Sequence, residues 1–445
     1  MTSGGDALIP AVGKPQPIRL PNVRDHALAN GLRVLIARRA GIPRFESRLA
    51  LSTAQGGSGE APRLRVLTET MLAGTPKRSS RDIAEGLQAM GGGLGSSSDA
   101  EQLILGGSCL SVNRRAFLDL LGEVVQDAAF PAHEVAIERD RVVQEIALLR
   151  SQPGVVAADA LLARIYGNHV YGHGTPDPDA VAAVAPATLR RLHAARVRPD
   201  RGLLVLAGDL DIDRTLADLE TALGGWEQGE PFRALRSPVI STPAPLLLVD
   251  RPGAVQTNIR FGGPAVPRSD PGYPALALAV TVFSGYFTSR LNDNIREQKG
   301  YTYGAHSRIE HRKVSAYLSI STDVGREVTA PALVEIGYEL GRMVSQPVAP
   351  AELDAARRYL QGTLAMGIQT QAGLTSYLAT LAGAGLPVEY LREYPAALER
   401  VTPADVLEAA RRFLSPRRLA MVLVGDAAAI RPTLDPLGEV ELATQ

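Results

Sequence analysis

Cysteine and tryptophan are almost absent from this sequence. Its 445 residues include one cysteine and one tryptophan, and aromatic residues make up 5% of the chain. A single thiol rules out an internal disulfide. Cys109 lies in the apolar run from Leu103 to Leu110, which predicts a buried, unreactive side chain. We therefore expect neither a disulfide scaffold nor a cysteine nucleophile.

Excess charge of one sign is lacking as well. Lys plus Arg and Asp plus Glu each total 47, so the formal net charge is +0. Without a basic excess the chain has no general attraction for nucleic acid or anionic lipid, and we expect no nucleic-acid partner.

Long apolar runs are also missing. No stretch reaches the roughly 18 apolar residues that a membrane helix needs. The segment from Met1 to Asn22 is interrupted by Gly5, Pro10 and Gly13, so it lacks the continuous apolar centre of a signal peptide. We expect no membrane span and, as the sequence stands, a cytoplasmic location, with the periplasm as the alternative.

An internal repeat is the clearest feature that the sequence does contain. Val184 to Asp209 aligns without a gap on Val401 to Asp426, with nine identities in twenty-six positions. Both copies read as proline, helix, second proline, and an apolar strand that ends in Gly-Asp. The repeat predicts two homologous domains, at 20–226 and 246–442, joined by a proline-rich linker at 227–245.

Hydrophobic periodicity gives each half the same mixture of elements. In the first half it predicts strands at 32–36, 48–51 and 102–110 and helices at 63–72, 80–90, 117–128 and 133–149. In the second half it predicts strands at 246–250, 256–261, 301–309 and 316–321 and helices at 273–283, 289–298, 330–344 and 351–366. This pattern indicates an α+β fold in which each half has an antiparallel-rich sheet with helices packed on one face.

The first half carries a recognisable arrangement on two of its predicted helices. The helix at 63–72 runs into Gly74-Thr75, and Glu145 lies on the helix at 133–149. This frame resembles the pitrilysin/insulinase family of zinc peptidases. In that family a helix carrying HxxEH is followed by a Gly-Thr pair and, about 75 residues on, by a third ligand glutamate. The resemblance implies two domains of the LuxS/insulinase-like type.

The zinc ligands of that family are replaced in this sequence. The two histidines at i and i+4 bind Zn²⁺ from one helix face, and the glutamate between them acts as general base. Anchoring on the Gly-Thr pair and on Glu145 places Arg65 and Glu69 at the histidine positions and Thr68 at the base. A guanidinium cannot coordinate zinc, so we expect no metal in this chain. Glu69 and Glu145 are then solvated or ion-paired, with Arg65 as a partner.

A frame shifted by one residue is the alternative. It places Val66 and Thr70 at the histidine positions and keeps Glu69 as the base, but it misplaces the Gly-Thr pair. Both histidines are absent in either frame. We prefer the first.

Two other motifs are assigned structural roles. His169 and His173 stand at i and i+4, but the glycines around them predict a loop, which removes the helical geometry that would give this spacing meaning. The glycine run 91–95 follows a helix and lacks a G-K-[ST] ending, so it predicts a helix terminator leading into an edge strand rather than a phosphate loop.

The second half keeps a stronger signature. Ser289-Arg290-Leu291 opens a predicted helix that ends at Gly300 and contains Arg296, and Tyr303 follows. This stretch resembles the second-half signature of the same family. The resemblance implies that Arg296 and Tyr303 reach toward a zinc site, in the other half or in another subunit, and there bind substrate and stabilise the tetrahedral intermediate. A guanidinium and a phenol are suitable hydrogen-bond donors for that role. The alternative is that both are structural.

Together these features lead to one functional hypothesis. The chain resembles the subunit without zinc of a heterodimeric zinc endopeptidase, similar to the processing-peptidase alpha subunit type. Its expected partners are a homologous half-sized subunit with intact HxxEH, which would hold the zinc, and a peptide substrate. The alternative is a catalytically inactive scaffold subunit of a larger complex, like the core proteins of the mitochondrial respiratory complex.

Overall fold

The computed structural model describes residues 13, 18–19, 21–53, 59–230, 235–242 and 245–444. The expected domain start at residue 20 and two parts of the expected linker, 231–234 and 243–244, lie outside the described residues. The described linker residues at 227–230 and 235–242 form neither helix nor strand. The domain boundaries stay a prediction.

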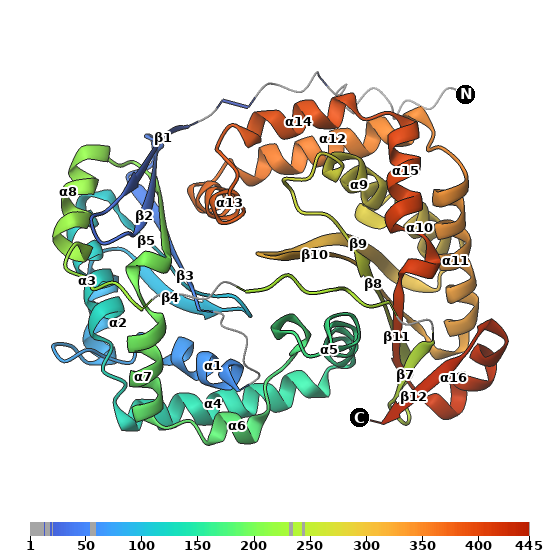
Figure 1. The fold of residues 1–445 in the computed structure, drawn as a ribbon, viewed down its shortest axis with the longest axis horizontal. Coiled ribbons are helices and arrows are strands. Elements are labelled where there is room, and N and C mark those ends of the chain that lie inside the picture. The colour runs from blue at the N-terminus through green and yellow to red at the C-terminus, as the bar shows by residue number, and fades with distance from the viewer. Residues whose placement is uncertain are drawn as a thin grey trace, which may run out of the picture.

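Two sheets of six strands form the centre of the molecule (Figure 1). The first sheet has the order β1-β2-β6-β3-β5-β4. Its strands are β1 Asn22–Ala27, β2 Arg33–Arg38, β3 Arg44–Ser52, β4 Gly93–Ser98, β5 Gln102–Leu110 and β6 Gly202–Gly208. The second sheet has the order β12-β7-β11-β8-β10-β9. Its strands are β7 Leu246–Asp250, β8 Gln256–Pro264, β9 Thr302–Arg312, β10 Ser315–Gly325, β11 Ala420–Gly425 and β12 Val440–Thr444.

The helices follow the strands in the same order in both halves. Those of the first half are α1 Glu60–Thr70, α2 Ser80–Ala89, α3 Arg114–Asp127, α4 Ala132–Ser151, α5 Pro153–Tyr166, α6 Pro178–Ala182, α7 Pro186–Arg196 and α8 Ile212–Leu223. Those of the second half are α9 Tyr273–Val280, α10 Arg290–Asn292, α11 Thr329–Ser345, α12 Pro350–Gly367, α13 Gln371–Gly383, α14 Tyr390–Arg400, α15 Pro403–Phe413 and α16 Ala427–Leu434. Two π-helical segments, η5 Thr281–Gly285 and η6 Asp293–Gln298, extend α9 and α10.

The two sheets share one topology, which confirms the repeat and the α+β fold. β2 runs parallel to β6 and β7 parallel to β11, and the remaining shared pairs are antiparallel. The repeated sequence forms α7 with β6 and α15 with β11. Both of these helices begin at a proline, which suits the first helical turn because the missing N–H has no partner there. Only the outer strands differ, since β1 is antiparallel and β12 parallel to its neighbour.

Most helices of each half pack on the outer face of their own sheet, but α5 and α13 are exchanged. Strand alternation sends Leu35 and Ala37 of β2 to the inner face, where they pack against Leu374 and Leu378 of α13. In the same way, α5 packs against β11 and β8 of the second sheet. Figure 1 shows both helices between the two sheets. This exchange buries apolar surface of each half against the other and holds the halves together.

Several local predictions are confirmed. Cys109 is buried, and burial raises the pKa of its thiol. The glycine run ends α2 and leads into β4, which is the edge strand of the first sheet.

Among the described helices none is by itself long and apolar enough to cross a membrane. The α4–α5 pair passes that test together but is bent by 89°.

Candidate functional site

Arg65 and Glu69 of α1 meet Glu145 of α4 in an ion-pair cluster. One terminal nitrogen of Arg65, Nη2, lies 2.9 Å from each carboxylate oxygen of Glu145 and 3.2 Å from Glu69 Oε1. The i, i+4 spacing places Arg65 and Glu69 on one helix face, and the packing of α1 on α4 brings that face to Glu145. The side chains are 20% to 36% exposed, so the cluster is open to solvent at one side.

A second arginine completes the cluster. Arg141 of α4 pairs with Glu69, lies 3.4 Å from Glu145 Oε2, and lies 2.7 Å from Glu138 Oε2. The hydrogen bond to the Glu138 carboxylate raises the pKa of the Arg141 guanidinium. Two cations therefore share the two carboxylates that α1 and α4 present to each other. No sequence motif marks Arg141, because its contribution depends on a long side chain that reaches across to Glu69 of α1 and along α4 to Glu145.

The two possible frames of the degenerate motif place their residues in different surroundings. Val66 and Thr70 of the shifted frame are fully buried, and the Thr70 hydroxyl donates to the Val66 carbonyl at 2.7 Å. Thr68 is buried too, and its hydroxyl donates to the Leu64 carbonyl at 2.7 Å. In the first frame Arg65 contacts Glu145 directly, and Glu69 joins the same cluster through Arg65 and Arg141.

These residues do not fit a zinc ion. The cluster offers two carboxylates and no imidazole or thiolate, and two guanidinium groups already bind those carboxylates. Across the residues that the structure describes, no group of three His, Cys, Asp or Glu side chains is arranged to hold a metal. The cluster is an ion-paired contact between α1 and α4.

The His169 to His173 segment forms a short 3-10 turn, η3 Val170–Gly172, rather than an α-helix. His169 Nδ1 accepts a hydrogen bond from the Tyr171 backbone at 3.3 Å, and its Nε2 lies 3.1 Å from the Arg236 carbonyl. Tyr171 has a structural role in this turn, because its buried hydroxyl donates to Glu101.

Arg296 lies on the π-helical segment η6, and Tyr303 lies near the start of β9. The Arg296 guanidinium stands 4.2 Å from the centre of the Phe287 ring, and its Nε lies 3.4 Å from Glu297 Oε1. Tyr303 is 92% exposed, and no described residue makes a hydrogen bond with its hydroxyl. π-Helical turns are rare and are often found at functional sites. Tyr303 is therefore fully accessible to a ligand, whereas the Arg296 side chain is 33% exposed.

The sequence reasoning missed Asn292, which ties these two elements together. Its side-chain amide donates to the Ala305 carbonyl at 2.8 Å and accepts from the Ala305 N–H at 2.8 Å. Between them the chain turns at Gly300, whose φ of +65° is a conformation that other residues seldom adopt. Asn292 and Gly300 thus fix the segment that carries Arg296 against the strand that carries Tyr303.

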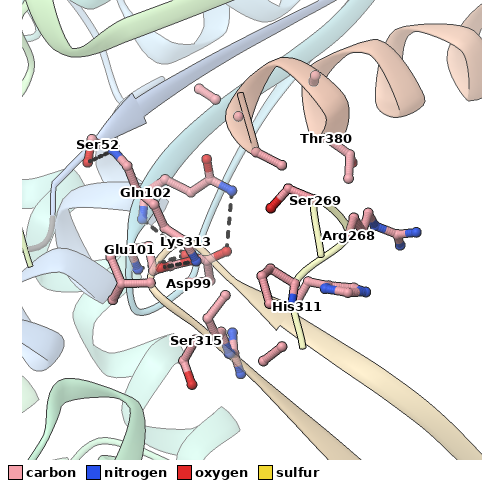
Figure 2. A pocket seen from close by; sticks show the side chains of 18 of the residues that line it. Ser52, Asp99, Glu101, Gln102, Arg268, Ser269, His311, Lys313, Ser315 and Thr380 are labelled. Atoms are coloured by element: carbon pink, nitrogen blue, oxygen red, sulfur yellow. Dashed lines mark hydrogen bonds between the residues drawn. The ribbon is translucent and has the colours of Figure 1, made fainter. Parts of the chain in front are cut away.

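A further contact joins the two halves at the tips of their β-hairpins. Glu101, in the turn between β4 and β5, accepts hydrogen bonds from the Tyr171 hydroxyl and from the Lys313 backbone N–H, the latter at 2.6 Å (Figure 2). Lys313 lies in the turn between β9 and β10. Burial raises the pKa of Glu101. This contact joins residues 212 positions apart, which local sequence patterns cannot indicate.

The cluster around Arg65 and the pair Arg296 and Tyr303 belong to different halves. Within the described chain no hydrogen bond, ion pair or ring contact joins the two groups.

The fold and the degenerate motif define a peptidase-like protein built of two similar halves. A family model described as Insulinase (Peptidase family M16) matches residues 66–179, and one described as Peptidase M16 inactive domain matches residues 183–360. The chain belongs to the insulinase family, peptidase family M16.

Curated relatives are named as zinc proteases, and two solved structures share the fold of this chain. An uncharacterized zinc protease of Mycobacterium tuberculosis is 27% identical over 374 residues, which cover 82% of this chain and 84% of that protein. Another, from Streptomyces coelicolor, is 24% identical over 425 residues and covers 91% and 89%. The crystal structure of a peptidase M16 inactive domain from Pseudomonas fluorescens has a TM-score of 0.84 at 23% identity, covering 91% of this chain and 98% of that one. A protease from Helicobacter pylori gives 0.83 at 15% identity, covering 92% and 100%.

Proposed function

We propose that this chain is the subunit without zinc of a heterodimeric zinc endopeptidase. Its partner is a homologous half-sized subunit with an intact HxxEH motif, and its substrate is a peptide or an unfolded segment. In this assembly Arg296 and Tyr303 act on the substrate beside the partner's metal. The chain is required for hydrolysis but does not hydrolyse peptides alone.

The observation that carries this proposal is a contrast between the two halves. The first half has an arginine in place of a zinc ligand, and its remaining carboxylates are bound by guanidinium groups. The second half keeps Arg296 and an exposed Tyr303 on a segment whose geometry Asn292 fixes. An exposed phenol without a described partner contributes little to stability, so a role in binding is the better reason for its position.

The roles of the two side chains follow from their chemistry. The guanidinium is a permanent cation with several N–H donors, and the phenol is a neutral donor near pH 7. Both can donate to the carbonyl oxygen of the peptide bond and to the negative charge that develops there. A preorganised donor of this kind typically contributes about 3 to 4 kcal/mol to transition-state stabilisation.

Reconstitution tests the proposal. The chain is co-expressed with an HxxEH homologue from the same genome, and the isolated proteins and the pair are compared for zinc content, size and hydrolysis of quenched fluorescent peptides. We expect zinc in the partner, a stable heterodimer, and activity only in the pair. An assembled pair that holds zinc but hydrolyses no peptide would favour the scaffold alternative. One tightly bound zinc in the isolated chain would contradict the proposal.

A further inference from the structure

A cavity of about 810 Å³ lies between the two halves, within the range of about 300 to 1,000 Å³ that ligand pockets usually have. Its walls come from β3 and the β4–β5 turn of the first half and from α13 and the β9–β10 turn of the second. Figure 2 shows Ser52 and Gln102 of the first half across an open space from Ser269 and Thr380 of the second. The cavity is thus built where the exchanged helix α13 packs on the first sheet, close to the β9–β10 turn of the second.

The lining of this cavity is strongly basic, although the whole chain has a net charge of +0. Five cationic side chains line it: Arg48, Arg201, Arg268, Arg312 and Lys313. Only two acidic side chains do so, Asp99 and Glu101. The positive charge is therefore a local property of the cavity.

The two carboxylates attract Arg312 from a distance but form no direct ion pair with any of these cations. Asp99 Oδ1 accepts the backbone N–H groups of Glu101 and Gln102 at 2.7 and 3.0 Å, which shapes the turn. Glu101 is bound by the Tyr171 hydroxyl and the Lys313 backbone. Neither carboxylate forms an ion pair with a described residue. Neutral donors satisfy both, and the cationic side chains keep their charge.

Two of the five cationic side chains make hydrogen bonds to the protein itself. Arg268 Nη1 donates to the Tyr273 hydroxyl at 2.9 Å, and in Figure 2 its guanidinium points away from the open space. Arg201 donates to the main-chain carbonyls of Ala195 and Glu230. These two residues stabilise the walls.

The other three cations have almost no partners among the described residues. Arg48 lies on the inner face of β3 and makes no described side-chain hydrogen bond or ion pair. The Arg312 guanidinium stands 5.8 Å from the centre of the Tyr171 ring, and its buried Nε has no partner. Lys313 Nζ reaches only the Ser52 hydroxyl, at 3.5 Å. Burying a guanidinium nitrogen without an acceptor is costly, so an anion that enters the cavity would remove that cost.

We propose that this cavity binds acidic side chains of the peptide substrate, with Arg48, Arg312 and Lys313 as the groups that contact the carboxylates. The inference rests on the proposed function because it names the substrate class of that function. A planar guanidinium matches a carboxylate in a two-point contact, and the ammonium of Lys313 adds a third donor at the hairpin tip. A substrate with a basic segment would be repelled by the same lining.

Binding of designed peptides to the isolated full-length chain tests the inference without the partner subunit. Three probes share one Ala/Ser scaffold and a neutral dye, and differ only in carrying several Glu, Gln or Lys residues. We expect the Glu peptide to bind about tenfold or more tightly than the Gln peptide in fluorescence anisotropy, because charge-assisted hydrogen bonds are stronger than neutral ones. The Lys peptide should bind most weakly, and added salt should reduce the difference.

Substitutions locate the site. The double variant Arg48→Gln/Arg312→Gln should abolish most of the preference for Glu. Arg115→Gln/Arg214→Gln, on exposed helix surfaces of the first half, changes the net charge equally and should leave the preference intact. If the first double variant does not fold, Lys313→Gln at the exposed hairpin tip replaces it and should reduce the preference for Glu.

Equal binding of the three peptides would overturn the inference, and so would a Glu preference that survives the cavity variants. Because this assay needs neither zinc nor hydrolysis, its failure is distinct from failure of the proposed function. If the chain prefers the Glu peptide but gives no activity with any HxxEH homologue, the binding site would be supported and the proposed endopeptidase role would be contradicted. Inorganic phosphate serves as a competitor, because a cavity that binds any small anion would bind phosphate as well. If phosphate displaces the Glu peptide at a concentration no higher than that of the peptide itself, the assignment to a peptide ligand would be overturned.

Discussion

The double substitution Arg65→His/Glu69→His should create a zinc site on α1 and α4. It places imidazoles at i and i+4 on the helix face that already contacts Glu145, which gives the two-histidine, one-carboxylate set of catalytic zinc sites. An imidazole is shorter than an arginine side chain, so the space now filled by the Arg65 guanidinium is left for the metal. In this variant Glu145 loses its cationic partner Arg65, and the bound zinc would restore a positive charge beside it.

The size of the effect follows from the contacts. Removing Arg65 and Glu69 together keeps the local charge balanced, and at 20% to 36% exposure the lost ion pairs should cost only about 1 kcal/mol. Zinc at about 100 times its Kd should then stabilise the variant by about 2.7 kcal/mol. For a domain of about 200 residues this corresponds to a rise in Tm of roughly 5 to 10 °C.

The shifted frame supplies a matched control. Val66→His/Thr70→His retains Glu69 as the base of that frame but inserts two imidazoles into a fully buried part of the core. Overpacking and polar burial should cost about 3 kcal/mol or more, and no zinc should bind. Metal analysis after dialysis and thermal unfolding with and without zinc would measure both variants. The reasoning is refuted if the folded Arg65→His/Glu69→His variant binds no zinc, or if the shifted variant binds it.

Three further outcomes are expected. The native chain should retain less than one zinc per molecule after dialysis, and its Tm should not respond to zinc. Glu101→Ala should lower the free energy of unfolding in urea by about 3 kcal/mol, because it leaves the buried Tyr171 hydroxyl and the Lys313 N–H without an acceptor; an unchanged midpoint would contradict this. Burial lowers the pKa of His193 from 6.5 to about 4, so the folded state binds fewer protons than the unfolded state between these values. Stability should therefore fall by about 3 kcal/mol as the pH drops through this window, and His193→Leu should remove that loss.

Much of the fold could be predicted because its signals are local or repeated. The apolar periodicity of α3 and α11 and the prolines that begin α7 and α15 need no knowledge of tertiary structure. β1 was missed because most of its residues are exposed and no apolar alternation marks it. The exchange of α5 and α13 was missed too, since an apolar helix face does not reveal which sheet it covers.

The candidate site was predictable where spacing decides geometry. The i, i+4 relation predicts that Arg65 and Glu69 share one helix face, and the structure shows Arg65 bound to both Glu69 and Glu145. Arg141 pairs with Glu69, and Asn292 bonds to Ala305 of β9. Both contacts depend on the length of the side chain and on how the helices pack, which the sequence does not show. The cavity between the halves depends on the placement of α13, which no local pattern records.

The central claim is that this chain supplies hydrogen-bond donors to a zinc site in its partner, and Tyr303→Phe tests it most directly. The substitution removes one exposed hydroxyl that contacts no described residue, so folding and assembly should be unaffected. Tyr338→Phe, at another exposed tyrosine of the second half, is the control. In the reconstituted pair we predict that Tyr303→Phe lowers kcat about 10²- to 10³-fold while the partner's zinc content and the heterodimer stay the same, and that Tyr338→Phe has no effect. An assembled pair that cleaves peptides at the unaltered rate without the Tyr303 hydroxyl would contradict the account.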